Sequence, residues 1–209
     1  MKKMELIKIS LIGLITLSVF SCNSSNKKTE SKTSTINKES EKTDNVKYQI
    51  DTDVSVIHWK GSMIGVYAHE GDLKLKSGNF SLNNSNIVEG EFTVDVNSMI
   101  TTDDDALYKM APREKLIGHL KSADFFDTEN FPTAIFKITK VNGNEVFGNL
   151  TIKGKTNEEK LTNVKVQDNH LSGLLTIDRQ KYGVTYKNKM NDMILSDDLE
   201  LNVEITGKK

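Results

Sequence analysis

The chain has 209 residues with 28 basic and 29 acidic side chains, and its formal net charge is −1. This balance gives no support for a nucleic-acid partner, which would favour a basic face, and we expect none. Cys22 is the single cysteine, which excludes a disulfide framework within the chain. Hydrophobic residues make up only 36% of the sequence, because a polar segment near the N-terminus lowers the share.

Residues 1–21 have the pattern of a secretory signal peptide. Lys2–Lys8 contains three lysines, and Ile9–Phe20 is a mostly apolar run that is too short to span a bilayer comfortably. Ser21 and Cys22 at the end of this run resemble a bacterial lipoprotein box. That resemblance implies cleavage before Cys22 and lipidation of its thiol and new amino group, and more than one acyl chain gives stable anchoring. The alternative is a signal peptide with a chance cysteine.

Residues 22–45 are predicted to form a disordered polar tether. Between Asn23 and Asn45 the only apolar residue is Ile36, and the lysines and acids alternate without a block of one sign. Such a segment cannot bury enough apolar surface to fold. As a flexible chain it would reach roughly 25 Å on average, which would hold the following domain clear of a membrane.

From residue 46 to residue 209 the apolar residues recur with a period of two, which is typical of strands with one buried and one exposed face. In Leu199–Ile205 every second residue is Leu, Val or Ile, and the residues between are polar. Turn-forming sequences such as Asn142–Asn144 separate the runs. The predicted strands are Val54–Gly61, Leu73–Lys76, Ser77–Leu82, Phe92–Asn97, Ala134–Val141, Val146–Lys153, Leu161–Gln167, Leu171–Asp178 and Leu199–Thr206.

About eight antiparallel strands must hide their edges either by closing into a barrel or by forming a sandwich, and composition alone does not choose between these. A helical insertion is expected at Asp103–Leu120. Asp103–Asp105 suit a helix N-terminus electrostatically, and Pro112 fits the first turn of a second short helix. Placed between two strands, this insertion would cover one mouth of a barrel.

His119–Phe136 is unusually aromatic, because it holds four of the eight phenylalanines of the chain. Ser122 is expected to cap a short turn over Ala123–Phe126, and Pro132 is expected to start the extended run that follows. The pattern predicts a plug, a compact turn that presses aromatic rings against a sheet. An ordinary aromatic mini-core would explain the phenylalanines equally well.

Several sequence pieces, in order and spacing, resemble the YceI-like family over nearly all of Tyr48–Ile205. These pieces are YQID (Tyr48–Asp51), SVIHWKG (Ser55–Gly61), GEFTVDVNSM (Gly90–Met99), HLKSADFF and FPTAIF (within His119–Phe136), GNLTIKGKT (Gly148–Thr156), TIDRQKYGVTY (Thr176–Tyr186) and the closing SDDLELNV. Members of the family are described as lipocalin-like barrels that bind polyisoprenoid lipids. The resemblance therefore implies an all-β domain over residues 46–209: an eight-stranded antiparallel lipocalin-like barrel with a short helical insertion.

The resemblance also implies a long apolar ligand, an isoprenoid or quinone-like lipid, in the barrel interior, and no other cofactor. An eight-stranded barrel is just wide enough for a chain-like ligand, although the same strands filled by their own side chains would form a solid core. The period of two does not say which aromatic residues point inward. The candidates for the cavity wall or plug are Trp59, Phe80, Phe92, Phe125, Phe126, Phe131 and Phe136.

Histidine side chains raise the alternative of a metal site, because imidazole is the commonest metal ligand. His58, His69 and His119 have no helical i, i+4 pairing, and no cysteine accompanies them. We expect structural roles instead, with His58 in a strand, His69 in a loop and His119 at a helix end. No metal site is predicted.

Arg179 is expected to pair with an acid elsewhere in the fold, and Asp124 is the candidate. An alternative is that Arg179 lines the barrel mouth and meets a ligand head group. No nucleophile–base motif, metalloprotease motif or phosphate-binding glycine loop is present, so the chain is predicted not to be an enzyme.

The favoured function is a lipid-anchored carrier or reservoir for an isoprenoid lipid, held to the membrane through Cys22. The sequence favours the periplasmic side of the bacterial envelope, because lysines rather than acids follow Cys22. One alternative is a non-catalytic stress or interaction module with a filled barrel core. Another is an accessory of a membrane redox protein. The sequence leaves the oligomeric state open.

Overall fold

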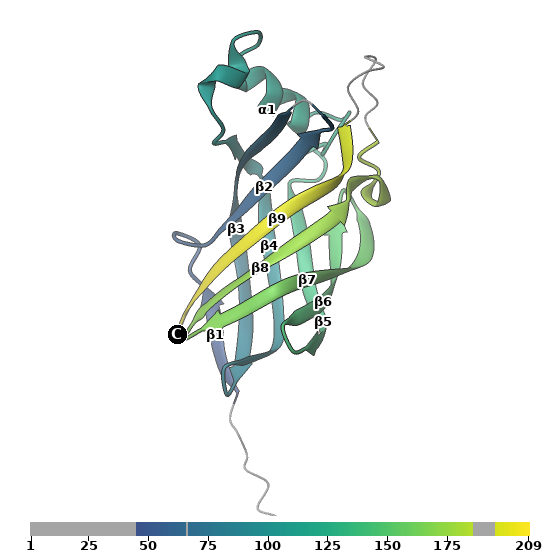
Figure 1. Ribbon diagram of the computed structural model, residues 1–209. Coiled ribbons are helices and arrows are strands. Elements are labelled where there is room, and N and C mark those ends of the chain that lie inside the picture. The colour runs from purple at the N-terminus through teal and green to yellow at the C-terminus, as the bar shows by residue number, and fades with distance from the viewer. Residues whose placement is uncertain (1–44, 66, 186–194) are drawn as a thin grey trace, which may run out of the picture. The chain divides into compact units, whose positions relative to one another are not determined.

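The structure, a computed structural model, describes residues 45–65, 67–185 and 195–209 (Figure 1). The predicted signal peptide, the lipidation site Cys22 and the tether up to residue 44 lie outside the described residues. The elements, in order, are β1 (Val46–Ile50), β2 (Val56–Met63), β3 (Tyr67–Asn83), β4 (Asn86–Thr101), η1 (Asp105–Tyr108), α1 (Arg113–Lys121), β5 (Thr133–Asn142), β6 (Glu145–Ile152), β7 (Lys155–Gln167), β8 (His170–Asp178), η2 (Arg179–Tyr182) and β9 (Leu195–Lys208).

The strands close into an antiparallel barrel. Around the sheet the order is β3-β2-β9-β8-β7-β6-β5-β4, and β4 pairs with β3 again to complete the circle. β1 and β2 share one position between β3 and β9, because β1 pairs with the second half of β3 and β2 with the first half. The barrel therefore has eight positions although the described chain has nine strands, and the prediction of an eight-stranded antiparallel barrel with a short helical insertion is confirmed.

β3 is one continuous strand where the sequence pattern predicts two, Leu73–Lys76 and Ser77–Leu82. Leu73 and Leu75 face the interior, and the pairing with β4 shifts register between Leu75 and Ser77. This irregularity inserts an extra residue and returns Phe80 and Leu82 to the buried side. A single strand can therefore line the barrel along its length despite the break in the two-residue period.

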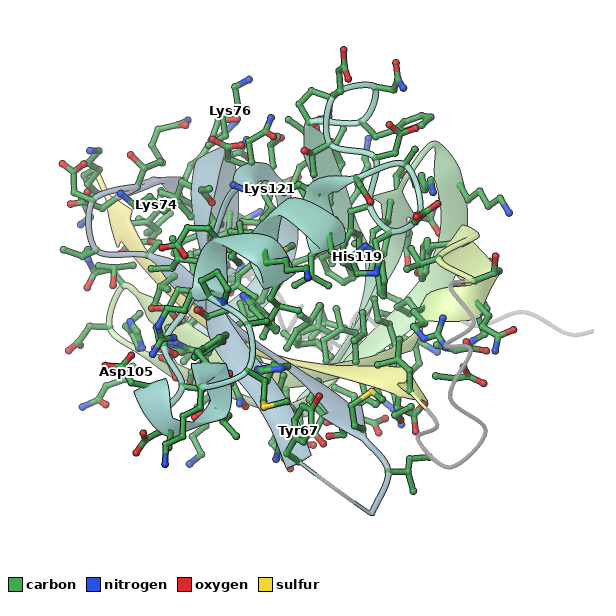
Figure 2. All side chains as sticks on the ribbon, turned by 90° about the horizontal axis from the view of Figure 1, so that it is seen from above. Tyr67, Lys74, Lys76, Asp105, His119 and Lys121 are labelled. Carbon is green, nitrogen blue, oxygen red and sulfur yellow. The ribbon has the colours of Figure 1, made fainter. Side chains whose placement is uncertain are left out.

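The helical insertion lies between β4 and β5, as predicted, but its caps differ in detail. Asp104, the middle residue of the aspartate run, caps η1 by accepting a hydrogen bond from the Ala106 amide at 2.7 Å. Pro112 immediately precedes α1 instead of lying in its first turn. Viewed along the barrel, α1 crosses one end of it (Figure 2). Among the described residues no helix has the length and apolar run needed to cross a membrane.

The opposite end of the barrel lies near β1 and the C-terminus (Figure 1). Side chains pack closely inside it. Phe80 is fully buried there, stacks on Tyr48 with ring centroids 5.2 Å apart and lies 6.4 Å from the Phe92 ring. Gly207 permits this packing, because a Cβ at that position would lie 2.8 Å from the Phe80 ring. The space inside the barrel extends from the α1 end towards this packed end, where Ile87, Leu171 and Ile205 line it.

Candidate functional site

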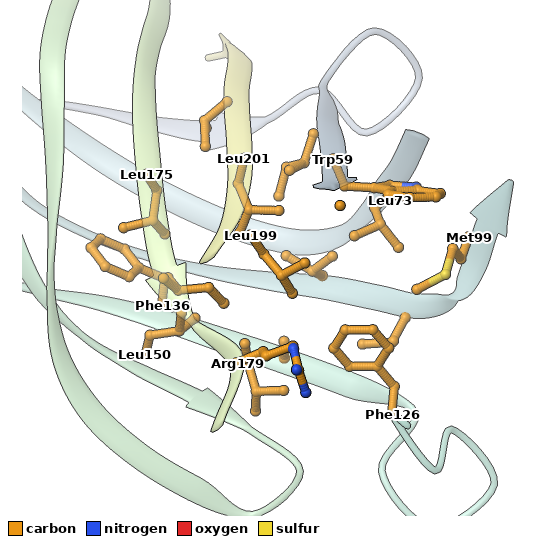
Figure 3. A pocket seen from close by; sticks show the side chains of 18 of the residues that line it. Trp59, Leu73, Met99, Phe126, Phe136, Leu150, Leu175, Arg179, Leu199 and Leu201 are labelled. Carbon is orange, nitrogen blue, oxygen red and sulfur yellow. The ribbon is translucent and has the colours of Figure 1, made fainter. Parts of the chain in front are cut away.

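The barrel interior holds a cavity of about 370 Å³. Side chains of β2 to β9, α1 and η2 line it, and the majority are aliphatic or aromatic (Figure 3). The volume falls within the range of small-molecule sites, which is about 300–1,000 Å³. Such a wall offers few hydrogen bonds, so it suits a hydrocarbon chain.

The inward-facing residues of β9 show that the interior is hollow. Leu199, Leu201 and Val203 line the cavity, yet each retains partial exposure, whereas Ile205 beyond them is buried. In a solid core all four would be buried, since they lie on the same face of one strand. The alternative of a barrel filled by its own side chains therefore does not fit this interior.

Five of the seven predicted aromatic candidates line this cavity: Trp59, Phe92, Phe125, Phe126 and Phe136. The Trp59 ring is held at the wall because its Nε1 donates a hydrogen bond to the Ile100 carbonyl at 3.1 Å. These five rings come from β2, β4, β5 and the turn after α1. The barrel thus brings together residues that are far apart in sequence, while their contribution to lipid binding stays a prediction.

The two other candidates, Phe80 and Phe131, are not among the lining residues. Phe80 fills the β1 end, as described above. Phe131 lies over the turn between β6 and β7, where a Cβ on Gly154 would approach its ring to 3.1 Å. Both rings pack the fold away from the cavity.

The segment after α1 forms the compact aromatic turn that the sequence predicts. The Phe126 amide donates to the Leu120 carbonyl at 3.1 Å, and Lys153 Nζ donates to the Phe125 carbonyl at 2.7 Å, which ties the turn to the end of β6. The Phe125 ring packs edge-on against His119 with centroids 4.9 Å apart. The Ser122 hydroxyl, predicted to cap the turn that follows, instead donates to the His119 carbonyl at 2.7 Å and ends α1.

Arg179 is a charged residue in the cavity wall, and its partner differs from the predicted Asp124. Its side chain is only 5% exposed, and Nη2 donates to Asp197 Oδ1 at 2.8 Å. The same guanidinium donates to the carbonyls of Val184 and Ser196, at 2.5 and 2.9 Å. Figure 3 shows Arg179 among apolar side chains, so this network both neutralises a buried charge and joins η2 to the start of β9.

His69 also lines the cavity, and it lies in β3 instead of the predicted loop. Its Nδ1 is 2.7 Å from Oδ2 of Asp103, whose side chain is 5% exposed. Tyr108 Oη donates to Asp103 Oδ1 at 2.5 Å, and Arg113 Nη1 donates to the same oxygen at 3.0 Å. This cluster fastens the η1–α1 segment to β3 at the mouth of the cavity.

The Asp103 carboxylate is held in its charged form by this cluster. Burial acts to raise its pKa, but hydrogen bonds from Tyr108, His69 and the Glu70 amide outweigh burial, and the net pKa lies below its ordinary value of 3.8. Tyr108 responds in the opposite direction, because burial and its bond to Asp103 raise the pKa of its hydroxyl. The cluster therefore contains one anion that accepts hydrogen bonds from several donors.

The remaining histidines have partners on the sheet surface or at the helix end. His58 Nδ1 lies 2.6 Å from Asp72 Oδ1 on the outer face, and His170 Nε2 lies 2.7 Å from Glu204 Oε2. In the part of the chain that the structure describes, no group of three or more His, Cys, Asp or Glu side chains is arranged to hold a metal ion.

A family model described as the YceI-like domain matches residues 48–207. The chain belongs to the YceI-like family. The family predicted from the sequence motifs is thereby confirmed. Among curated relatives, this YceI-like chain is 38% identical over 79 residues to a UPF0312 protein of Staphylococcus aureus, covering 33% of this chain and 46% of that protein. A UPF0312 protein of Staphylococcus epidermidis is 35% identical over the same length and coverage. The chain spans about half the length of the curated relatives that it matches.

Among solved structures, BcnA of Burkholderia cenocepacia superposes on this YceI-like protein with a TM-score of 0.59 and 22% identity, covering 76% of this chain and 99% of BcnA. At 22% sequence identity, the structural similarity to BcnA shows a shared fold. A polyisoprenoid-binding domain from Saccharophagus degradans aligns with a TM-score of 0.49 and 11% identity over 77% of this chain and 97% of that domain.

Proposed function

We propose that this YceI-like protein binds a long apolar lipid of the isoprenoid or quinone type inside its barrel and acts as a carrier or reservoir. The observation that carries the proposal is the hollow apolar interior of about 370 Å³ beneath α1. Membership of the YceI-like family supports the choice of an isoprenoid chain over other apolar ligands. The proposed role is binding without catalysis.

The physical chemistry of the wall is sufficient for binding of this kind. Each buried CH₂ contributes about 0.8 kcal/mol, so one five-carbon isoprenoid unit contributes roughly 4 kcal/mol before the costs of ordering the chain. A few such units exceed those costs. Affinity therefore grows with the length of chain inside the barrel, and no catalytic group is needed to explain it.

The test is native mass spectrometry of the chain purified from the cell envelope, followed by lipid extraction. We expect one additional mass in the isoprenoid-lipid range that is released when the protein is denatured. Acyl chains attached to Cys22 would remain after denaturation, which separates the anchor from the cargo. Protein that stays empty after incubation with quinones and polyprenyl lipids would refute the carrier function and favour an interaction module.

The anchor and the location are part of the same proposal. Lipidation at Cys22, followed by a polar tether up to residue 45, would place the barrel in the periplasm close to a membrane that supplies its ligand. Cys22→Ser should move the protein from the membrane fraction to the soluble fraction. Resistance to protease in intact cells, and digestion after the outer membrane is opened, would support the periplasmic side. A membrane redox protein as partner stays a prediction.

A further inference from the structure

His69 is one of the few polar side chains on a mostly apolar inner surface, together with Tyr67, His119, Ser172 and Arg179. It lies on the same face of β3 as Leu73 and Leu75, and all three line the cavity. Its residue partner on β2 is Gly61, which has no side chain and also lines the cavity. Because His69 itself lines the cavity, its imidazole borders the open interior at the η1–α1 end.

The hydrogen bond to Asp103 fixes how the ring presents its two nitrogens. The Asp103 carboxylate accepts from Tyr108 and Arg113 through Oδ1 and lies 2.7 Å from His69 Nδ1 through Oδ2. An ionised carboxylate has no proton to donate, so Nδ1 carries the hydrogen of this bond. In the neutral ring, Nε2 then carries the lone pair and is a hydrogen-bond acceptor.

Nε2 is the ring nitrogen that this arrangement leaves available. The two ring nitrogens of an imidazole point in diverging directions. When Nδ1 is hydrogen-bonded to Asp103, Nε2 therefore points away from Asp103. No hydrogen bond joins Nε2 to another of the described residues, and the His69 side chain is 18% exposed. The nearby rings of Tyr67 and Tyr108, at 5.1 and 5.5 Å, restrict its rotation.

We propose that His69 Nε2 accepts a hydrogen bond from the hydroxyl head group of a prenyl lipid, so that the head lies at the η1–α1 end and the tail runs towards β1. The inference rests on the proposed lipid-binding function and narrows its ligand class to lipids with a terminal hydroxyl, such as prenols or quinols. The filled β1 end, closed by Phe80, leaves this single direction for the tail.

The test compares geranylgeraniol with its methyl ether, which has the same tail but no hydroxyl hydrogen. Trp59 is the single tryptophan of the chain and lines the cavity, so the emission of the full chain reports binding directly. We expect the alcohol to bind about 3- to 10-fold more tightly than the ether, the effect of one hydrogen bond. Equal affinities in the wild-type chain would overturn the head-group site while leaving lipid binding intact. Binding of neither ligand would refute both proposals.

The variant His69→Asn tests whether His69 is the residue that binds the hydroxyl group. The asparagine amide can occupy the Nδ1 position and still donate to Asp103, but it lacks a counterpart of Nε2. We expect the preference for the alcohol to disappear and the affinity for the ether to change less than 2-fold. The matched control is His58→Asn, which alters the similar His58–Asp72 pair on the outer face and should keep the preference. A preference retained in His69→Asn would overturn the assignment.

A measurement on the wild-type chain does not depend on how the variants fold. The chain has four histidines, whose ring nitrogens can be followed by ¹⁵N NMR. Geranylgeraniol should shift the Nε2 signal of His69, the methyl ether should shift it much less, and the signals of His58 should stay in place with both. An unchanged His69 signal in the alcohol complex would contradict the proposal.

Discussion

At the scale of single residues, Tyr182 and Glu159 form a buried pair outside the cavity lining. Tyr182 Oη donates to Glu159 Oε1 at 2.9 Å, and the two residues are 1% and 8% exposed. Burial, followed by the bond to Glu159, raises the pKa of the Tyr182 hydroxyl, so the phenol keeps its proton and remains a donor. The pair joins η2 to β7 and thereby fixes one side of the cavity mouth.

Tyr182→Phe should lower the free energy of unfolding by about 1–3 kcal/mol, because the ring remains while a buried carboxylate loses its donor. Urea denaturation measures the change. Tyr48→Phe is the matched control: the Tyr48 hydroxyl makes no hydrogen bond to the described residues, and its loss should cost less than about 0.5 kcal/mol. Equal losses in the two variants would contradict the importance of the buried pair.

Gly148 gives the Phe136 ring its place in the cavity wall. A Cβ at Gly148 would lie 2.4 Å from the ring of Phe136 and 2.7 Å from the Lys137 carbonyl. Gly148→Ala should therefore destabilise the protein by about 1–3 kcal/mol through overpacking. Gly118→Ala in α1, where nothing lies within 4 Å of the added carbon, should stabilise it by up to about 1 kcal/mol. Thermal unfolding of the two variants should shift in opposite directions.

At the scale of elements, the η1–α1 segment depends on the Asp103 cluster for its attachment to β3. The pKa of Asp103 is lowered in the folded protein, so its contribution to stability is fully present above the ordinary value of 3.8 and is lost as the pH falls through the lower folded value. Acidification below about pH 4 should therefore weaken the attachment of the η1–α1 segment to β3 before it destabilises the sheet.

Asp103→Asn should lower the free energy of unfolding by about 1–3 kcal/mol at pH 7. The asparagine amide has a single oxygen and cannot replace both carboxylate oxygens as hydrogen-bond acceptors. The difference in unfolding free energy between wild type and variant should narrow as the pH is lowered from 5 towards 3. Urea denaturation at several pH values measures this difference in unfolding free energy. The contributions of the other carboxylates cancel, because both proteins contain them. Asp104→Asn is the control, because asparagine caps a helix as well as aspartate does. A difference independent of pH would contradict this role for Asp103.

The sequence pattern predicts an element well where local alternation of apolar and polar residues defines it. It predicts poorly those features that depend on tertiary contacts. Alternation identifies β9, because this strand has one apolar face. It does not reveal that β3 continues through the irregularity after Leu75, since an inserted residue resets the period of two. Nor does it identify Asp197 as the partner of Arg179, because that pairing depends on η2 lying beside the start of β9 in the fold.

The aromatic candidates show the same limit within the site. Hydrophobic pattern and family resemblance select seven rings, and five line the cavity. Phe80 and Phe131 have the same local pattern as the other five, but one packs against Tyr48 and the other over Gly154. The sequence singles out His69 only as a possible metal ligand and places it in a loop, because its position at the cavity depends on strand β3 and on Asp103 from a different element.

At the scale of the whole barrel, stability and lipid capacity compete for the same interior. An unfilled apolar cavity costs roughly 24 cal/mol per Å³, so side chains that fill it stabilise the fold and exclude the ligand. Conversely, a bound lipid stabilises the hollow barrel by mass action, by about 2.7 kcal/mol at a concentration of 100 times its dissociation constant. A barrel that evolved for rigidity alone would contain larger residues at the inner positions of β9.

Leu201→Phe tests this competition, because Leu201 lines the cavity on β9 and keeps partial exposure there. The larger ring should raise the free energy of unfolding of the empty protein by about 1 kcal/mol and weaken binding of a polyprenyl chain at least about 10-fold. Polyprenol should then raise the melting temperature of the wild type strongly and that of the variant weakly. Val88→Phe, at a residue that is 43% exposed and outside the lining, should leave the lipid-induced shift unchanged. If Leu201→Phe binds as tightly as wild type, the lipid does not occupy this part of the interior.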